Sequence, residues 1–306
     1  MSRSPRRPPQ LRGRIFRGSH AITSGLLTRN DLRSSAWRPL FRDVYADAQL
    51  SVTHRTRCAA VSRWLIPPAG AIAGRSAAAL YGCARVAADD PVDVIVPPDV
   101  RVGSIAGLRV RRGPIDPGDV LDRAGTSVTS PVRTCWDLAL WLDLVEAVVA
   151  IDALLSRRLT DVSALRGYAL ARAGRRGWRA MLRAVDLADA GAESPQESRT
   201  RVRLVLAGLP RPRTQWVVSD RGRFVARLDL AWPDYRVAVE YDGLWHADPE
   251  QFHSDRRRLN RLVTGDWIIL HLTAKRLRED FEGFVSEVRA ALRSRGHRPP
   301  SFSGAG

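Results

Sequence analysis

The sequence predicts an α/β (α+β) protein built from several domains. Its 306 residues give room for two or three domains that can each bury a core. A hydrophobic fraction of 44% with nine tryptophans argues against disorder. Segments with helical apolar spacing alternate with short runs in which every second residue is apolar, so we expect helices and strands along most of the chain.

The two ends of the chain are expected to lie outside the folded parts. Residues 1–14 contain five arginines and three prolines and no acidic residue. This composition predicts either a flexible basic arm that lies along DNA phosphates or a disordered tail. We expect a second flexible tail over residues 297–306.

Residues 15–50 show the pattern of a short helix-turn-helix. Thr28 and Asp31 have the spacing of a helix N-terminus, and Gly25 precedes them as a turn residue. We expect a second helix over residues 29–35 and a short strand over residues 41–45 that forms a wing. The helix would present three side chains that reach base edges or phosphates, Arg29, Asn30 and Arg33. The alternative is an ordinary helical hairpin with an exposed arginine-rich face.

Residues 51–190 are expected to be a mixed α/β scaffold. The predicted elements are helices over residues 53–65, over 71–81 and from 131 onward, and strands over 92–96 and 108–112. We find no catalytic pattern in this part, and we expect the acids of the long helical stretch, Asp137, Asp143 and Glu146, to be solvated. The arginines of residues 172–183 fit either a helix face for DNA or a solvated connector.

Residues 191–296 are expected to fold as a separate domain. A capping box formed by Ser194 and Glu197, with Pro195 at the first helical position, predicts its first helix. The further elements are strands over residues 215–218, 223–231, 236–241 and 267–272, and helices over 249–262 and 277–292. The two middle strands flank Pro233, Asp234 and Tyr235, which is typical of a β-hairpin.

The hairpin brings acidic residues together if its tight turn is Asp234-Tyr235. Counting back along both strands then sets Asp229 opposite Glu240, with Cβ atoms about 5 Å apart. Two facing carboxylates repel each other, and a hard divalent cation such as Mg²⁺ or Mn²⁺ is the natural ion to hold them. A register slip of one residue would offset the pair, and the simpler alternative is an edge hairpin with solvated acids.

The order of these residues resembles a known family of nucleases. Glu197, Asp229, the stretch Glu240-Tyr-Asp242-Gly-Leu-Trp-His246, and Asp255-x-x-Arg258 are similar to the PD-(D/E)XK nuclease superfamily, most closely to the branch related to very-short-patch-repair endonucleases. The resemblance covers about residues 190–280. It implies a restriction-endonuclease-like mixed sheet flanked by helices, metal-dependent phosphodiester hydrolysis, and a metal site at Asp229 and Glu240, with Glu197 in a supporting role.

One position departs from the superfamily's pattern. The superfamily often has lysine two residues after the second acid, whereas this chain has Asp242, and Lys275 is its only lysine. Either Asp242 is a third metal ligand and His246 transfers the proton, or the domain has lost cleavage and retains binding. His246 also fits a simple packing role beside Trp245. Two arginines of the following helix, Arg256 and Arg258, are expected to hold phosphates, unless Asp255 and Arg258 pair locally.

The N-terminal half resembles a second family. Residues 15–50 are similar to the winged helix-turn-helix of abortive-infection (type IV toxin–antitoxin) antitoxin-like transcriptional regulators. Gly74–Gly82 and Pro131–Thr134 resemble the part that follows in the same family. This resemblance implies a DNA-binding module.

Charge and composition favour a nucleic-acid partner and a cytoplasmic location. The net charge of +17 and pI near 11.3 suggest an anionic polymer, although an arginine-rich coding bias would also produce them. Three widely spaced cysteines indicate a reducing compartment, and neither a signal peptide nor a membrane-spanning run is evident. We therefore expect a metal-dependent DNA endonuclease or, alternatively, a non-cleaving DNA-binding regulator. The sequence does not separate DNA from RNA as substrate, and a homodimer is compatible with it.

Overall fold

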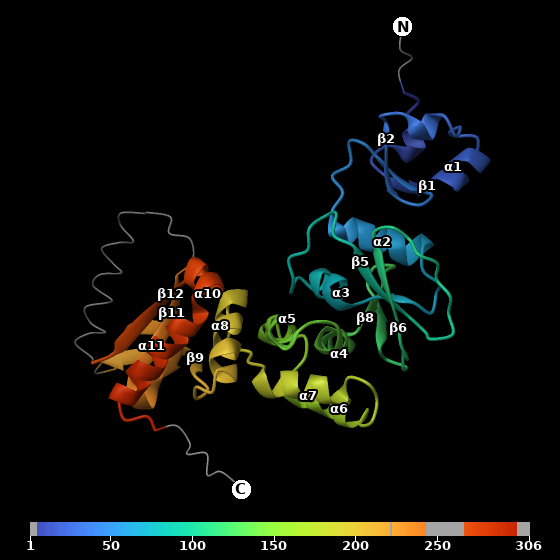
Figure 1. The fold of residues 1–306 in the computed structure, drawn as a ribbon. Coiled ribbons are helices and arrows are strands. Elements are labelled where there is room, and N and C mark those ends of the chain that lie inside the picture. The colour runs from blue at the N-terminus through green and yellow to red at the C-terminus, as the bar shows by residue number, and fades with distance from the viewer. Residues whose placement is uncertain (1–4, 221, 243–265, 299–306) are drawn as a thin grey trace. The chain divides into compact units, whose positions relative to one another are not determined.

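The computed structural model describes residues 5–220, 222–242 and 266–298 (Figure 1). The chain divides into two compact units. Unit 1 comprises residues 1–141 and 163–181, and unit 2 comprises residues 142–162 and 182–306. The described residues form three separate sheets and numerous helices. The predicted mixed α/β class with several parts is therefore confirmed.

Unit 1 begins with a small lobe around a three-stranded sheet of order β1-β3-β2. Its elements are a 3-10 turn at Pro9–Leu11, β1 (Ile15–Arg17), α1 (Gly18–Thr23), a 3-10 turn at Asp31–Arg33, β2 (Trp37–Phe41) and β3 (Val44–Asp47). Its core contains Leu11, Phe16, Leu27 and Trp37.

Two sequence predictions for this lobe were wrong. The expected helix over residues 29–35 is a single 3-10 turn at Asp31–Arg33. The Ser34 hydroxyl donates to the Asp31 carbonyl at 2.6 Å, a local bond that competes with helix continuation. The expected single strand over residues 41–45 is divided: Phe41 ends β2, Val44 and Tyr45 begin β3, and Asp43 in the turn between them adopts a positive φ of 62°.

The predicted basic arm is folded over much of its length. Arg7 donates to both carboxylate oxygens of Asp47, at 2.5 and 2.7 Å, and Leu11 is buried in the lobe's core. Burial would raise the pKa of Asp47, but hydrogen bonds from Arg7, Gly13 and Gln49 lower it to about 2. Residues 7–14 are thus part of the lobe.

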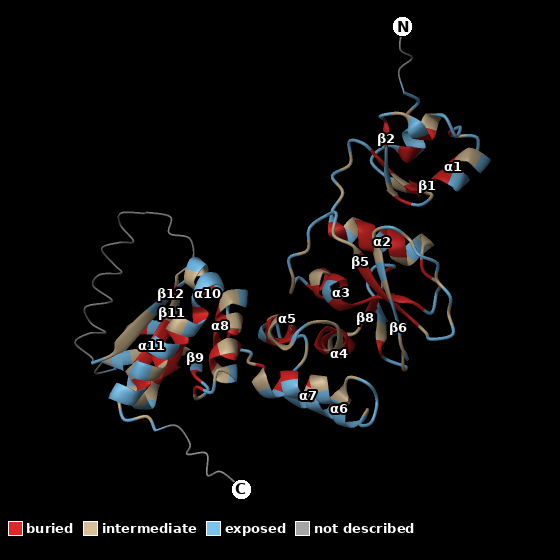
Figure 2. Ribbon diagram, viewed as in Figure 1, coloured by how far each residue is buried: buried red, intermediate tan, exposed pale blue. Residues whose placement is uncertain are grey.

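The rest of unit 1 surrounds a five-stranded mixed sheet of order β6-β5-β4-β8-β7. Its elements are α2 (His54–Trp64), β4 (Ala71–Ile72), α3 (Gly74–Leu80), β5 (Val92–Val96), β6 (Leu108–Arg112), β7 (Val120–Asp122), β8 (Ser127–Thr129), α4 (Pro131–Trp141) and α6 (Val162–Leu170). The strands at 92–96 and 108–112 are confirmed, and β5 is buried along its whole length (Figure 2). The expected helix over 71–81 is instead a short strand followed by α3.

A buried ionic network in unit 1 corrects another expectation. Asp137, which we expected to be solvated, is 1% exposed and accepts from Arg133 Nε at 2.9 Å. Arg133 also donates to Asp119 at 2.6 Å, and Asp119 accepts from the Tyr168 hydroxyl at 2.7 Å. Asp137 was misjudged because Asp119, which shares Arg133 with it, is distant in sequence. Burial raises the pKa of Asp137 to about 7 despite Arg133.

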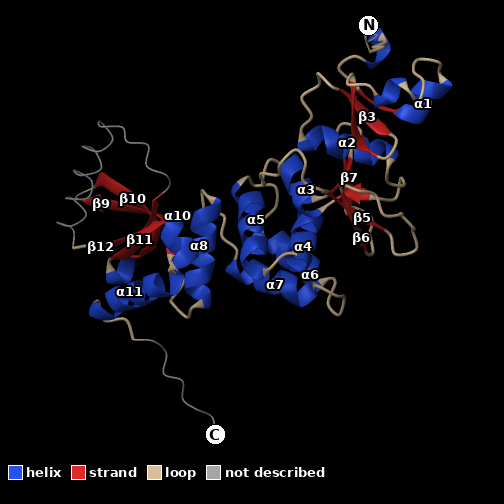
Figure 3. Ribbon diagram, turned by 45° about the horizontal axis from the view of Figure 1, so that its top comes forward, coloured by secondary structure: helices blue, strands red, loops and turns tan. Residues whose placement is uncertain are grey.

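Unit 2 contains a four-stranded mixed sheet of order β12-β11-β10-β9 (Figure 3). Its elements are α5 (Leu144–Ser156), α8 (Pro195–Leu206), β9 (Arg213–Asp220), β10 (Arg223–Trp232), a 3-10 turn at Pro233–Tyr235, β11 (Val237–Asp242), β12 (Ile268–Thr273), α10 (Ala274–Glu279) and α11 (Phe281–Ser294). Helix α7 (Trp178–Leu187) runs into this unit from the last segment of unit 1. The helix predicted over 249–262 lies outside the described residues.

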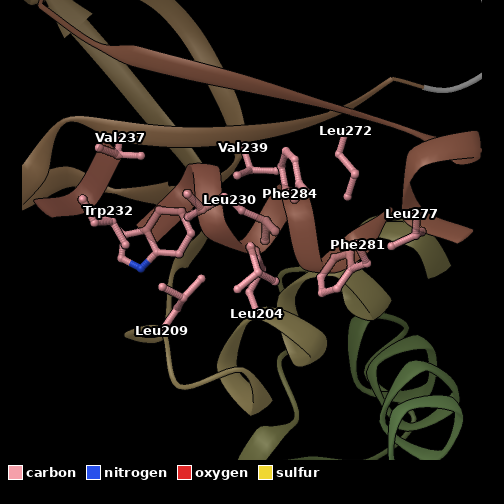
Figure 4. Close-up of a cluster of buried hydrophobic side chains, with 13 residues drawn as sticks. Leu204, Leu209, Leu230, Trp232, Val237, Val239, Leu272, Leu277, Phe281 and Phe284 are labelled. Carbon is pink, nitrogen blue, oxygen red and sulfur yellow. The ribbon is translucent and has the colours of Figure 1, made fainter. Parts of the chain in front are cut away.

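Helices α8 and α11 cover one face of this sheet. Leu204 of α8 and Phe284 of α11 pack against side chains of the strands, among them Leu230, Val239 and Leu272 (Figure 4). This apolar layer fixes α8 against β10 and β11, the elements that carry the predicted acidic residues.

A buried ion pair joins α8 to α5. Arg201, which is 0% exposed, donates to Asp152 at 2.7 Å. Asp152 also accepts from the Ser198 hydroxyl at 2.6 Å and from the Asp189 amide at 2.7 Å. Helix α5, which we expected within the 51–190 scaffold, therefore belongs to the core of unit 2.

No helix in the described ranges is both long and apolar enough to cross a membrane.

Candidate functional site

The β10–β11 hairpin has the register that the sequence predicted. Its paired residues are Leu230 with Val239, Ala231 with Ala238, and Trp232 with Val237. The turn closes through a hydrogen bond from the Arg236 amide to the Pro233 carbonyl at 3.1 Å. Asp229 and Glu240 are the next residues outward on the two strands. They are therefore the first residues beyond the paired segment, and the amide of Tyr241, which follows Glu240, donates to the Asp229 carboxylate.

Asp229 is half-buried and held at both oxygens. Its Oδ2 accepts from the backbone amide of Tyr241 on β11 at 3.0 Å. Its Oδ1 lies 3.5 Å from Nε2 of Gln215 on β9. Since each carboxylate oxygen can accept more than one bond, both retain capacity for a further ligand.

Glu197 reaches this group from the N-terminus of α8. The Ser194 side chain caps the helix by accepting from the Glu197 amide at 3.2 Å, which is half of the predicted capping box. The other half differs, because the Glu197 carboxylate accepts from the Glu193 amide at 3.0 Å. Glu197 is 7% exposed and also accepts from Gln215 Nε2 at 2.8 Å. Its role is thus wider than capping its own helix.

Gln215 connects the two acids, and sequence reasoning missed it. Its backbone φ is +50°, a left-handed conformation that costs on the order of 1 kcal/mol for a residue other than glycine. The sequence offered one weak signal, a polar residue at the start of an apolar strand. The positive φ itself is not readable from the sequence.

Asp242 is engaged by a second residue that we did not predict. Its Oδ1 lies 3.2 Å from Nδ1 of His271 on the neighbouring strand β12. The β11–β12 pairing is parallel and sets His271 beside Glu240. His271 interrupts the apolar run Ile268–Leu272, and this was the signal available in the sequence.

The described residues fit a metal ion that shares its coordination with substrate, but not a complete protein cage. Within the described ranges no group of three or more histidine, cysteine, aspartate or glutamate residues could hold a metal ion. The predicted ligand set Asp229, Glu240 and Asp242 is therefore not assembled as one group there. Mg²⁺ is usually bound through one or two carboxylates together with phosphate oxygens and waters. Asp229 and Glu240 can supply the two carboxylates.

Three predicted site residues lie outside the described residues. They are His246, Arg256 and Arg258.

The predicted nucleic-acid residues of the N-terminal lobe are exposed. Arg29, Asn30 and Arg33 all lie on its surface. Arg29 and Arg33 line a hollow of about 490 Å³ together with Ser19 and Tyr45. The hollow also contains Asp43, whose carboxylate accepts from the Ser19 hydroxyl at 2.6 Å. Two cationic side chains on one concave surface can accommodate a phosphate group.

These features define an α/β protein whose second unit carries an acidic group at one end of a mixed sheet. No protein-family model matches the chain. Over 208 residues the chain is 32% identical to an uncharacterized Mycobacterium tuberculosis protein, MT2308 in one strain and Rv2248 in another. The match spans 67% of this chain and 74% of that protein. The chain therefore belongs to the same family as this mycobacterial protein.

A solved structure from the same organism has a low similarity. The crystal structure of RV2827C protein from Mycobacterium tuberculosis gives a TM-score of 0.41 at 15% sequence identity. The alignment covers 71% of this chain and 91% of that one. Nothing about this protein's function follows from a likeness of that size.

Proposed function

We propose that this protein is a metal-dependent endonuclease that hydrolyses DNA phosphodiesters. The observation that carries the proposal is the junction of three elements in unit 2. Glu197 of α8 is joined through Gln215 to Asp229 of β10, and Asp229 and Glu240 are the first residues beyond the paired segment of the β10–β11 hairpin. Carboxylates converging from separate elements are the ligands that Mg²⁺ or Mn²⁺ prefers.

The residues of this group would have distinct roles. Asp229 and Glu240 would hold the cation, which when bound lowers the pKa of a coordinated water and stabilises charge on the phosphate. The Tyr241 amide fixes Asp229 Oδ2 and Gln215 lies near Oδ1, and each oxygen keeps capacity for a further ligand. His271, whose Nδ1 lies 3.2 Å from Asp242 Oδ1, would accept a proton from the attacking water.

The N-terminal lobe would supply contact with DNA. Exposed Arg29 and Arg33 are suited to phosphate oxygens, and Asn30 to a base edge or phosphate. The net charge of +17 favours association with a polyanion.

A second candidate is a DNA-binding regulator whose C-terminal unit no longer cuts. Two observations favour it. Two residues after Glu240 the chain has Asp242 in place of a lysine, and the Asp242 carboxylate already contacts His271. Lys275 does not substitute, because its side chain is 80% exposed and lies 3.9 Å from Glu279.

Plasmid cleavage separates the two candidates. Wild-type protein with Mg²⁺ or Mn²⁺ should nick or linearise DNA, and Asp229→Ala should lower the rate at least about 100-fold, because it removes a metal ligand. Asp234→Ala changes an exposed acid at the turn of the same hairpin and should leave the rate unchanged.

The remaining outcomes are equally specific. No cleavage by wild type together with retained gel-shift binding would refute the endonuclease and support the regulator. Equal cleavage by wild type and Asp229→Ala would also refute the proposed site. Preferential cleavage of an RNA of the same sequence would keep the site and change the substrate.

A further inference from the structure

We propose that Gln215 is a positioning residue that holds Glu197 and Asp229 at the spacing required by a divalent cation. The inference rests on the proposed function, which supplies the cation. Gln215 lies outside the predicted acidic set and would hold Glu197 and Asp229 in position before the ion binds.

The side chain of Gln215 contacts both acids. Its Nε2 donates to Glu197 Oε2 at 2.8 Å and lies 3.5 Å from Asp229 Oδ1. Ionised carboxylates only accept hydrogen bonds, so the NH₂ end of the amide, with its two donors, must face them. One neutral side chain thus reaches two acids from different elements.

The backbone of Gln215 is strained within an otherwise regular strand. Its neighbours pair regularly with β10, Thr214 with Leu230 and Trp216 with Leu228. Between them Gln215 has a φ of +50°, which is rare for a residue with a side chain. Strained conformations of this kind persist where the surrounding structure requires them, and they cluster at functional sites. Here the strained residue is the one that joins the two acids.

Repulsion between the carboxylates of Glu197 and Asp229 explains why a neutral hydrogen-bond donor between them would help to bind a cation. Glu197 and Asp229 come from α8 and β10, and their negative charges oppose close approach in the ion-free protein. An amide offers hydrogen-bond donors without a positive charge that would compete with the cation. Outer partners of metal-binding carboxylates typically contribute 10- to 100-fold in metal affinity. We therefore expect loss of the Gln215 side chain to weaken cation binding by about that factor.

The test uses the full chain, freed of metal by a chelator, and titrates it with Mn²⁺ in a calorimeter. Gln215→Gly removes the side chain and relieves the left-handed backbone, so its fold should be retained. The matched control is Gln196→Ala, a glutamine of α8 whose side chain contacts Arg199. Gln196→Ala should bind Mn²⁺ like wild type, and Gln215→Gly should bind it about 10- to 100-fold more weakly.

Hydrogen exchange of the ion-free proteins gives a second readout. The Glu193 and Tyr241 amides donate to Glu197 and Asp229 respectively. Both should exchange faster in Gln215→Gly, whereas the Phe284 amide within α11 should not change. A merely structural role would lower the protection of all three.

The outcomes distinguish this inference from the proposed function. Equal Mn²⁺ affinity and unchanged exchange in Gln215→Gly would overturn the role of Gln215 and leave the nuclease proposal intact. If wild type takes up no Mn²⁺, the proposed function and the cation part of the inference both fail. Faster exchange at Glu193 and Tyr241 would then still identify Gln215 as the link between the acids.

Discussion

Replacing Asp152 by alanine should destabilise unit 2 strongly. The change removes the acceptor of three donors at once: the Ser198 hydroxyl, the Arg201 guanidinium and the Asp189 amide. Arg201 is fully buried, so its charge would be left without its acidic partner. Removal of one partner from a buried ion pair typically costs about 3–5 kcal/mol. That is a large part of the 5–15 kcal/mol that usually stabilises a domain.

A paired replacement tests the physical reason. Asp152→Leu combined with Arg201→Met substitutes apolar groups for both charges, which is often neutral for stability. We expect the double variant to recover most of the loss. A neighbouring pair on the same two helices serves as control, because Glu146 and Arg199 are 41% and 30% exposed. Glu146→Ala should cost no more than about 1 kcal/mol.

Hydrogen exchange of peptides from α8 measures the effect in the full chain. A loss of about 3–5 kcal/mol corresponds to exchange faster by about two to four powers of ten, provided that exchange follows opening of the unit. If Asp152→Ala accelerates exchange no more than Glu146→Ala does, the buried pair does not stabilise the helix that carries Glu197, and the reasoning is wrong.

Three further predictions follow from other buried residues. The pKa of Asp47 is lowered to about 2, so its carboxylate contributes stability above pH 3.8 that is lost as pH falls towards 2. Asp47→Asn should therefore cost about 1–2 kcal/mol of stability at pH 7. The loss would be measured as faster hydrogen exchange of the Gly13 amide, which donates to Asp47. The pKa of Asp137 is raised to about 7, so the folded protein holds a proton that the unfolded chain releases above pH 3.8. Stability should therefore fall as pH rises from about 4 to 7, and Asp137→Asn should flatten that fall in thermal unfolding; equal slopes would contradict the assignment. Phe284→Ala should cost about 3–5 kcal/mol in urea unfolding, because its ring is fully buried between α11 and the sheet.

Local features of the fold were predictable from the sequence. The hairpin register followed from counting outward from Asp234-Tyr235, because side chains alternate along strands and the turn sets the pairing. The start of α8 followed from Ser194 and Pro195, since capping depends on adjacent residues. These predictions held because a few neighbouring residues determine each feature.

Features that depend on distant residues were missed. Asp137 looked like a surface helix charge because Asp119, which shares its arginine, lies far away in sequence. One local feature was missed as well: the Ser34 hydroxyl donates to the Asp31 carbonyl, a bond that competes with continuation of the helix expected after Thr28.

The candidate site was predicted in part for the same reason. Asp229 and Glu240 were indicated by one hairpin, whereas Gln215 and His271 join them from β9 and β12, strands whose order no local pattern reveals. The bond from Gln215 to Glu197 further requires a positive φ that arises only in the assembled sheet.

The route of the chain between the two units limits how the protein can be divided. The chain leaves unit 1 after residue 141, contributes α5 to unit 2, returns for residues 163–181, and then completes unit 2. A fragment starting at residue 191 would therefore contain the whole four-stranded sheet and yet lack the acid that neutralises Arg201. Exchange of the C-terminal unit between relatives, by recombination or by gene design, has to transfer residues 142–162 with it.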